Sequence, residues 1–199
     1  MAHGGREIEI KLAVASASAA RRLLQRAGFR VHRRKIFEAN TVFDTPDGAM
    51  RSTQRLLRVR EAAGQVLVTY KGPPEPGPHK SREELETAVS NARVSVAILD
   101  RLGYRPMFRY EKYRAEYRRP GSSGVATVDE TPIGTYVELE GNARWIDRTA
   151  RQLGFTLDQY ITASYGSLYL EWCQSRGLKP GNMVFEGRSQ KSVLRRQNR

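Results

Sequence analysis

Charged residues recur at every second position in several short segments of this 199-residue chain. In an extended strand, residues two apart point to the same face, so each such segment would present a small cluster of charges on one side. Lys and Arg side chains bind phosphate oxygens, arginine through a planar fork and lysine as a point charge. The basic residues placed for this chemistry are Lys11, Arg58, Arg60, Lys71, Arg82, Lys112 and Arg114.

The acidic residues of the same segments suit a different ligand. Carboxylates are hard oxygen donors of the kind that Mg²⁺ or Mn²⁺ prefers. The candidates are Glu7, Glu9, Glu138 and Glu140, with Asp129 as an additional one. Glu84 and Glu86 have two open roles, as ligands of a second metal or as partners that orient the arginines. A single cysteine and three scattered histidines give no zinc spacing, so we expect any metal to be held by oxygen.

The elements that would position these residues follow from the periodicity. Eight segments have the pattern of strands: 7–12, 30–44, 56–60, 65–71, 81–89, 108–119, 125–130 and 135–140. Helical spacing occurs at 18–28, 94–102, 144–153 and 163–174, and Pro and Gly residues mark the turn at 44–48 and the loop at 72–78. This order predicts an α+β chain of about eight strands.

The repetition of charged faces indicates how the strands are arranged. One strand with a charged face commonly turns that face to water, but here at least six strands carry paired charges, and helices follow several of them. If helices cover the apolar faces outside, the charged faces must point inward. About eight strands can close on themselves around a lumen that holds a small ligand. We therefore predict a closed eight-stranded antiparallel β-barrel, with helices packed outside, around a polyphosphate and a divalent cation.

The global composition is consistent with that prediction. A formal net charge of +13 at pH 7 favours a polyanionic partner. No apolar run approaches the roughly 18 residues of a membrane span, and the N-terminus lacks the pattern of a signal peptide, so we expect a cytoplasmic protein without a membrane partner. We expect one domain over residues 1–178 and a basic, flexible tail over 179–199.

The motifs also occur in a characteristic order along the chain. They are Glu7-Ile8-Glu9-Ile10-Lys11, Leu57-Arg58-Val59-Arg60, Thr69-Tyr70-Lys71-Gly72, Arg82-x-Glu84-x-Glu86, Lys112-x-Arg114, Val128-Asp129 and Val137-Glu138-Leu139-Glu140-Gly141. This order resembles the CYTH family, the triphosphate tunnel metalloenzymes, which includes class IV adenylyl cyclases and thiamine triphosphatases. The resemblance runs from about Glu7 to Tyr165. It implies an eight-stranded tunnel in which the five carboxylates named first bind metal and the basic set binds triphosphate.

Three functions follow as hypotheses. We assign catalytic roles to Glu7, Glu9, Lys11 and Lys71. The first hypothesis is a class IV adenylyl cyclase, whose branch of the family the Asp44-Thr45-Pro46 turn resembles, converting ATP to cyclic AMP and pyrophosphate. The second is a triphosphatase that releases orthophosphate from thiamine triphosphate, a nucleoside triphosphate or inorganic triphosphate.

The third hypothesis, from another class, is a nucleic-acid-binding module in which tyrosines such as Tyr110, Tyr113 and Tyr117 stack on bases. It is disfavoured because a nucleic-acid groove gains nothing from inward pairs of glutamates. The oligomeric state stays open, with a homodimer as one option.

Overall fold

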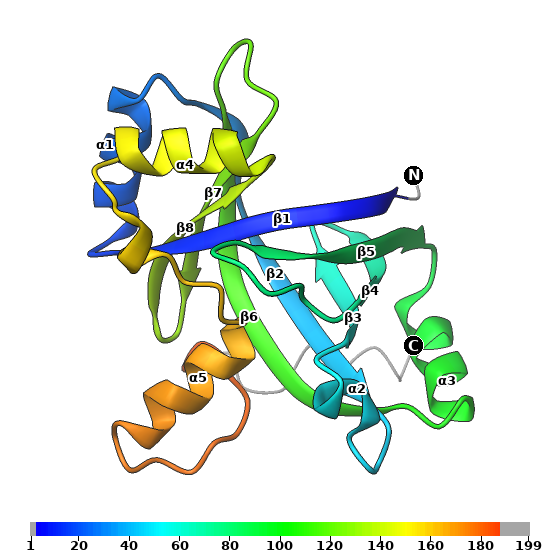
Figure 1. Ribbon diagram of the computed structural model, residues 1–199. Coiled ribbons are helices and arrows are strands. Elements are labelled where there is room, and N and C mark those ends of the chain that lie inside the picture. The colour runs from blue at the N-terminus through cyan, green and yellow to red at the C-terminus, as the bar shows by residue number, and fades with distance from the viewer. Residues whose placement is uncertain (1–2, 188–199) are drawn as a thin grey trace.

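Eight strands and several short helices make up residues 3–187, the part of the chain that this computed structural model describes (Figure 1). The strands are β1 (His3–Val14), β2 (Arg30–Asp44), β3 (Leu56–Ala62), β4 (Gln65–Lys71), β5 (Lys80–Val89), β6 (Arg105–Arg118), β7 (Val125–Thr131) and β8 (Gly134–Glu140). The eight predicted strands are confirmed, with ends that differ by a few residues. The prediction rested on the alternation of charged and apolar residues, which indicates a strand because the pleat places successive side chains on opposite faces.

The strands close into a barrel in the order β1-β5-β4-β3-β2-β6-β7-β8, and every neighbouring pair is antiparallel. The register brings charged residues together across the strands: Glu7 lies opposite Arg82, and Lys11 lies opposite Glu138. Directly opposed residues share a face of the sheet, so these side chains point into the same lumen. The prediction of a closed barrel with an inward charged face is therefore confirmed.

Helices lie outside the barrel, as expected. They are α1 (Ala17–Arg26), α2 (Ala49–Ser52), α3 (Ala92–Arg101), α4 (Ala143–Gln152), the 3-10 helix η1 (Leu157–Gln159) and α5 (Tyr165–Gln174). The side chains of Ile10 and Leu12 on β1 pack with Leu24 of α1 and Ile146 of α4 in a buried core on the outer face. Figure 1 shows α1 and α4 together beside β1, β7 and β8. Within residues 3–187, no helix has the length and apolarity needed to cross a membrane.

The wall of the barrel is uneven, because β2 and β6 have 15 and 14 residues whereas β7 and β8 have 7 each. The last β6–β7 pair is Tyr113 with Glu130, so the first half of β6 extends beyond β7. Helix α5 lies at this end (Figure 1). Met183 also pairs there: its N–H donates to Arg109 O at 3.0 Å, and its C=O accepts from Glu111 N at 2.9 Å. The division at 178/179 stays a prediction; residues 179–187 contain this ordered contact, and 188–199 lie outside the described residues.

The turn at 44–48 leads into α2, which is too short for its helical period to be read from the sequence. The carboxylate of Asp44 accepts hydrogen bonds from the backbone N–H groups of Thr45 (2.8 Å), Met50 (2.8 Å) and Arg51 (3.0 Å). Burial opposes ionisation of Asp44, but these three donors outweigh it and lower its pKa. Asp44 therefore holds α2 against the end of β2.

Replacing Asp44 with alanine should destabilise the fold by about 2–3 kcal/mol, because three N–H groups lose a charged acceptor. For a chain of this size that is a decrease of roughly 5–10 °C in Tm, measurable by circular dichroism. Asp47→Ala is the matched control, since Asp47 is exposed in the same turn and should change Tm by less than about 2 °C. Equal effects of the two substitutions would contradict the anchoring role.

Candidate active site

The lumen is a cavity of about 790 Å³. All seven basic residues predicted from the sequence line it, and so do Glu7, Glu9, Glu84, Glu86, Glu138 and Glu140. Asp129 is not part of the lining; it lies fully buried behind the lumen surface. The charges inside the barrel are therefore mixed, and the question is how they pair.

Lys11 lies between two carboxylates from β1 and β8. Its Nζ is 2.9 Å from Glu9 Oε1 and 3.5 Å from Glu138 Oε2, and the three side chains are almost fully buried. Burial alone would favour the neutral forms, but the carboxylates outweigh it and raise the pKa of Lys11. In turn Lys11, Lys80 and Lys71 outweigh burial at Glu9 and hold its pKa well below the ordinary value. Both groups are charged at neutral pH.

Lys71 from β4 makes a second cluster with Glu7 and Glu84. Its Nζ is 2.6 Å from Glu7 Oε2 and 2.9 Å from Glu84 Oε2. Arg82 Nε approaches the same oxygen of Glu7 at 3.5 Å. The pKa of Glu7 is nevertheless raised, first by burial and then by the carboxylate of Glu9, with Lys71 opposing both. Negative charge therefore accumulates along the β1 side of the lumen.

Asp129 from β7 is fully occupied by neighbouring donors. Its two oxygens accept from Arg114 at 2.7 and 2.6 Å, from Lys112 Nζ at 2.8 Å and from the phenol of Tyr165 at 2.7 Å. Burial opposes ionisation, but Arg114 and Lys112 hold the pKa of Asp129 far below its ordinary range. In this arrangement Asp129 positions two cations and a tyrosine at the lumen surface, and a metal ion would have to displace one of these donors to reach it.

Arg58 has a buried donor without a partner among the described residues. Its NH2 donates to Thr69 Oγ1 at 3.0 Å and its NH1 to Tyr110 Oη at 3.3 Å, while Glu86 Oε2 lies 3.4 Å from NH2. Its buried Nε has no hydrogen-bond partner within residues 3–187. A buried donor without an acceptor is costly, and a phosphate oxygen in the lumen would satisfy it. Neighbouring Arg60 donates from Nε to Asn40 Oδ1 at 2.9 Å.

Glu140 shows where a cation would be favourable. It lies opposite Glu9 across the β1–β8 pair, and the described residues provide it with no hydrogen bond or ion pair. Glu140 is exposed at the end of β8, but neighbouring atoms still desolvate its carboxylate; this, and then the carboxylates of Glu7 and Glu138, raise its pKa to about 7. These like charges around oxygen donors fit a hard divalent cation. Within residues 3–187, however, no three acidic, histidine or cysteine side chains are already arranged around one metal position.

Several charged residues inside the barrel were missed in the sequence, among them Lys80 and Glu38. Lys80 begins β5; its Nζ is 3.4 Å from Glu9 Oε1, and burial, together with Lys11 and Arg82, lowers its pKa to about 8 against the opposing effect of Glu9. The alternation that selected Arg82 extends back to Lys80 and could have identified it. Glu38 on β2 is buried with Lys112 Nζ at 3.6 Å and Arg60 Nε at 3.5 Å. The segment that contains Glu38 was predicted as a strand, but which of its side chains point into the lumen was not predicted.

Glu38 also gives a prediction about pH. Burial raises its pKa, but Lys112, Arg60 and Arg114 outweigh burial and lower it from 4.5 to about 2. A carboxylate with a lowered folded pKa stabilises the fold above its unfolded pKa, and this contribution is lost as pH falls from 4.5 toward 2. Between these values the free energy of unfolding, from urea titrations, should fall more steeply for the wild type than for Glu38→Gln. Parallel slopes would contradict the prediction.

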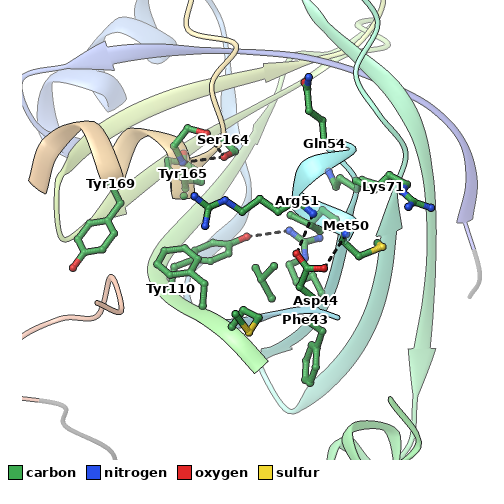
Figure 2. A pocket seen from close by; sticks show the side chains of 18 of the residues that line it. Phe43, Asp44, Met50, Arg51, Gln54, Lys71, Tyr110, Ser164, Tyr165 and Tyr169 are labelled. Atoms are coloured by element: carbon green, nitrogen blue, oxygen red, sulfur yellow. Dashed lines mark hydrogen bonds between the residues drawn. The ribbon is translucent and has the colours of Figure 1, made fainter. Parts of the chain in front are cut away.

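The lumen widens at the end where α2 and α5 lie. Figure 2 shows Tyr110, Tyr165 and Tyr169 on one side and Met50, Arg51 and Gln54 on the other. Burial opposes ionisation of the Tyr110 phenol, but Arg58, Lys112 and Arg60 outweigh it and lower its pKa to about 8. At the other end of the barrel a smaller cavity of about 250 Å³ shares Arg60, Arg114 and Glu140 with the lumen. The charged lumen is thus approached from both ends.

Comparison with known proteins identifies relatives of this chain. The family model of the CYTH domain matches residues 5–180. "Putative adenylate cyclase MJ0240" from Methanocaldococcus jannaschii is 30% identical over 135 residues, which are 67% of this chain and 75% of that protein. The PH1819 protein from Pyrococcus horikoshii OT3 superimposes with a TM-score of 0.71 at 25% identity, over 83% of this chain and 98% of that one. The adenylyl cyclase homologue HpAC1 from Hippeastrum gives a TM-score of 0.57 at 20% identity, over 87% and 97% of the two chains.

Proposed function

Because this chain belongs to the CYTH domain family, we propose that it is a divalent-metal-dependent enzyme that cleaves a triphosphate inside its barrel, and that its reaction is the conversion of ATP to cyclic AMP and pyrophosphate. The name of the M. jannaschii relative, "Putative adenylate cyclase MJ0240", supports the choice of reaction. The resemblance drawn from the motifs is confirmed at the level of the family; the substrate and the roles of single residues are part of the proposal.

The observation that carries the proposal is the mixed charge of a buried lumen. Basic side chains and carboxylates line the same cavity and neutralise one another in ion pairs such as Lys71 with Glu7 and Lys11 with Glu9. A triphosphate can take over the basic partners, provided that a cation takes over the carboxylates released. A metal-bound triphosphate supplies both charges at once, whereas a free anion or a free cation would leave half of the lumen unpaired.

The residues divide into two groups on this basis. The triphosphate would be bound by the basic set of the lumen, with the free Nε of Arg58 as one donor. Glu7, Glu9, Glu138 and Glu140 would hold the metal, and Asp129 would orient Lys112 and Arg114. A divalent cation bound there supplies Lewis-acid neutralisation of the phosphate oxygens. Glu7, Glu9, Lys11 and Lys71 lie nearest one another on the β1 side and are our candidates for the catalytic centre.

For cyclisation, the lumen must fix the substrate in one orientation. The ribose 3′-oxygen would form a bond to the α-phosphorus while the bond from that phosphorus to the bridging oxygen of pyrophosphate breaks. The proton of the 3′-hydroxyl is released, and the basic side chains neutralise the charge that develops on pyrophosphate. The contribution of this chain is mainly positioning and charge neutralisation, both of which a rigid barrel lined with buried ion pairs can supply.

The second candidate is triphosphate hydrolysis. HpAC1, described as a "putative adenylyl cyclase", has a dominant triphosphatase activity. The same lumen would bind thiamine triphosphate, a nucleoside triphosphate or inorganic triphosphate, and water would attack the terminal phosphorus to give orthophosphate. A nucleic-acid partner is disfavoured, because the charged side chains of the motifs lie inside the barrel. A strand of nucleic acid would have to enter the lumen and break the ion pairs that these side chains form with one another.

Product analysis tests the proposal directly. The purified protein would be incubated with ATP, thiamine triphosphate or inorganic triphosphate, each with Mg²⁺ or Mn²⁺, and the products separated by anion-exchange chromatography. We expect cyclic AMP and pyrophosphate from ATP. Orthophosphate from any of the three substrates would instead identify a triphosphatase, and no turnover in any condition would contradict both candidates.

A further inference from the structure

We propose that the wide end of the cavity binds the planar base of a nucleoside triphosphate, and that the C-terminal segment 180–183 is the specificity element that completes this base site. The inference rests on the proposed function, because it places the organic group next to a triphosphate bound in the lumen. It concerns a part of the cavity that the charged motifs do not reach.

One wall of the base site is aromatic. The ring of Phe108 lies near-parallel to those of Tyr110 and Tyr169, with ring centroids 5.9 Å apart in both pairs, and Tyr169 stacks in turn with Trp172. The rings of Phe108, Tyr110 and Tyr169 line the cavity, and so does Tyr165 at the start of α5. Figure 2 shows Tyr110, Tyr165 and Tyr169 along the same side. A planar base gains affinity from such a surface without losing hydrogen bonds, since its faces carry no polar groups.

The C-terminal segment holds this wall in place. Gly181 N donates to the Tyr169 phenol at 3.4 Å, and that phenol donates to Asn182 O at 3.3 Å. Asn182 Oδ1 accepts from Arg109 N at 2.9 Å, next to the backbone pairing of Met183 with β6. Met183 is 1% exposed and packs with Tyr110 and Tyr165. Pro180 and Gly181 line the cavity themselves. The segment thus fixes Tyr169 and forms one edge of the site.

Most of this edge lies beyond the part of the chain that the family model covers. The match to the CYTH domain ends at residue 180, so the contacts of residues 181–183 lie outside it. They fill the open edge of β6, since the other edge pairs with β2 over the same residues.

The opposite wall is polar. Arg51 and Gln54 lie there with Met50, held by the hydrogen bonds of Asp44 to α2. Gln54 has a φ of 55°, which is uncommon for a residue other than glycine, and its amide offers both donors and acceptors for the edge of a base. Arg51 and Arg55 line this end together with Asp44 and Asp47, so its positive and negative charges are balanced. Such a wall offers hydrogen-bond partners to the polar edge of a base.

The two parts of the cavity meet at Tyr110. Its ring belongs to the aromatic wall, and its phenol oxygen is 3.3 Å from NH1 of Arg58 in the lumen. A base stacked on the aromatic wall would therefore have its sugar near Tyr110 and its phosphates among the basic side chains. Inorganic triphosphate, which has no ring, would use the lumen alone.

The test compares these two ligands on the full-length protein. Isothermal titration calorimetry would give Kd for ATP and for inorganic triphosphate, each with Mg²⁺, for the wild type and Tyr169→Ala. We expect about tenfold weaker binding of ATP, because one stacking surface is lost, and an unchanged Kd for inorganic triphosphate. Tyr70→Ala is the matched control, since Tyr70 lies on β4 outside the cavity lining and should affect neither ligand.

Met183 tests the segment itself. Met183→Ala should weaken ATP binding severalfold without changing the Kd for inorganic triphosphate, because the segment loses its buried anchor. Met183→Leu keeps the volume and should restore the affinity for ATP, which separates positioning from a general loss of stability. Thiamine triphosphate would be titrated in parallel, and tighter binding of it than of ATP would overturn the assignment to the base of a nucleoside triphosphate.

The possible failures are distinguishable. If Tyr169→Ala weakens both ligands equally, or neither, the base site is wrong while the triphosphate lumen stands. If the wild type binds neither ATP nor inorganic triphosphate, the proposed function is contradicted and the base site with it.

Discussion

Substitution of Glu138 by glutamine should reduce turnover by at least about 100-fold, because it removes a charged ligand at the metal position while keeping the shape of the side chain. Glu138 Oε1 is 2.6 Å from Arg114 NH2 and its Oε2 is 3.5 Å from Lys11 Nζ. Both cations keep a second carboxylate in the variant, since Arg114 also binds Asp129 and Lys11 also binds Glu9. The barrel should therefore fold, and the loss should appear in kcat of the product assay.

Glu130→Gln is the matched control for this experiment. Glu130 lies on neighbouring β7, but its carboxylate pairs with Lys35 at the surface, at 3.2 Å, and lines neither cavity. Removing one exposed ion pair should cost less than about 1 kcal/mol of stability and leave turnover unchanged. Glu9→Gln should behave like Glu138→Gln. Near wild-type rates in both lumen variants would refute the assignment of the carboxylates to the metal.

Replacing Arg58 with alanine should weaken the binding of inorganic triphosphate by about 10- to 100-fold. The change removes the free Nε and one charge from the lumen, and hydrogen bonds between charged groups contribute about 1.5–3 kcal/mol. Glu86, which loses its arginine, still accepts from Thr69 Oγ1 at 2.7 Å and is partly exposed, so the fold should tolerate the change. Calorimetric titration measures the Kd, and thermal melting checks the fold.

Arg101→Ala controls for the loss of one positive charge. Arg101 is on α3, with a side chain that is 88% exposed, and it contributes nothing to the lumen. Its removal should leave the Kd unchanged, whereas Arg60→Ala should weaken binding as Arg58→Ala does. If neither lumen variant alters the affinity for inorganic triphosphate, the lumen is not the binding site, whatever the product assay shows.

The sequence by itself was enough to predict the barrel and its inward charges. Side chains two apart share a face of a strand, so Glu7 with Glu9 and Arg58 with Arg60 were each assigned to one side from local spacing alone. The helices after β1 and β8 then identified the apolar face as the outer one, and the packing of Leu12 against α1 confirms this. The order of the motifs further allowed the family to be predicted, which the match over residues 5–180 confirms.

The pairing of the charges depended on the tertiary structure. Which carboxylate meets which cation is set by the register between strands that are distant in sequence, as for Glu7 and Lys71, 64 residues apart. Periodicity within one strand contains no information about that register. Asp129 illustrates the consequence: the sequence offered it as a metal ligand, whereas the structure surrounds it with Lys112, Arg114 and Tyr165.

The wide end of the cavity also could not be predicted from the sequence, for a related reason. It is assembled from the turn and short helix at 44–54, from the start of β6, and from α5 with residues 180–183. The turns and the C-terminal segment have no repeating pattern that marks a face, and only closure of the barrel brings them together. The sequence therefore determined the charged lumen, which regular strands build by repetition, whereas the tertiary structure alone decided what surrounds its opening.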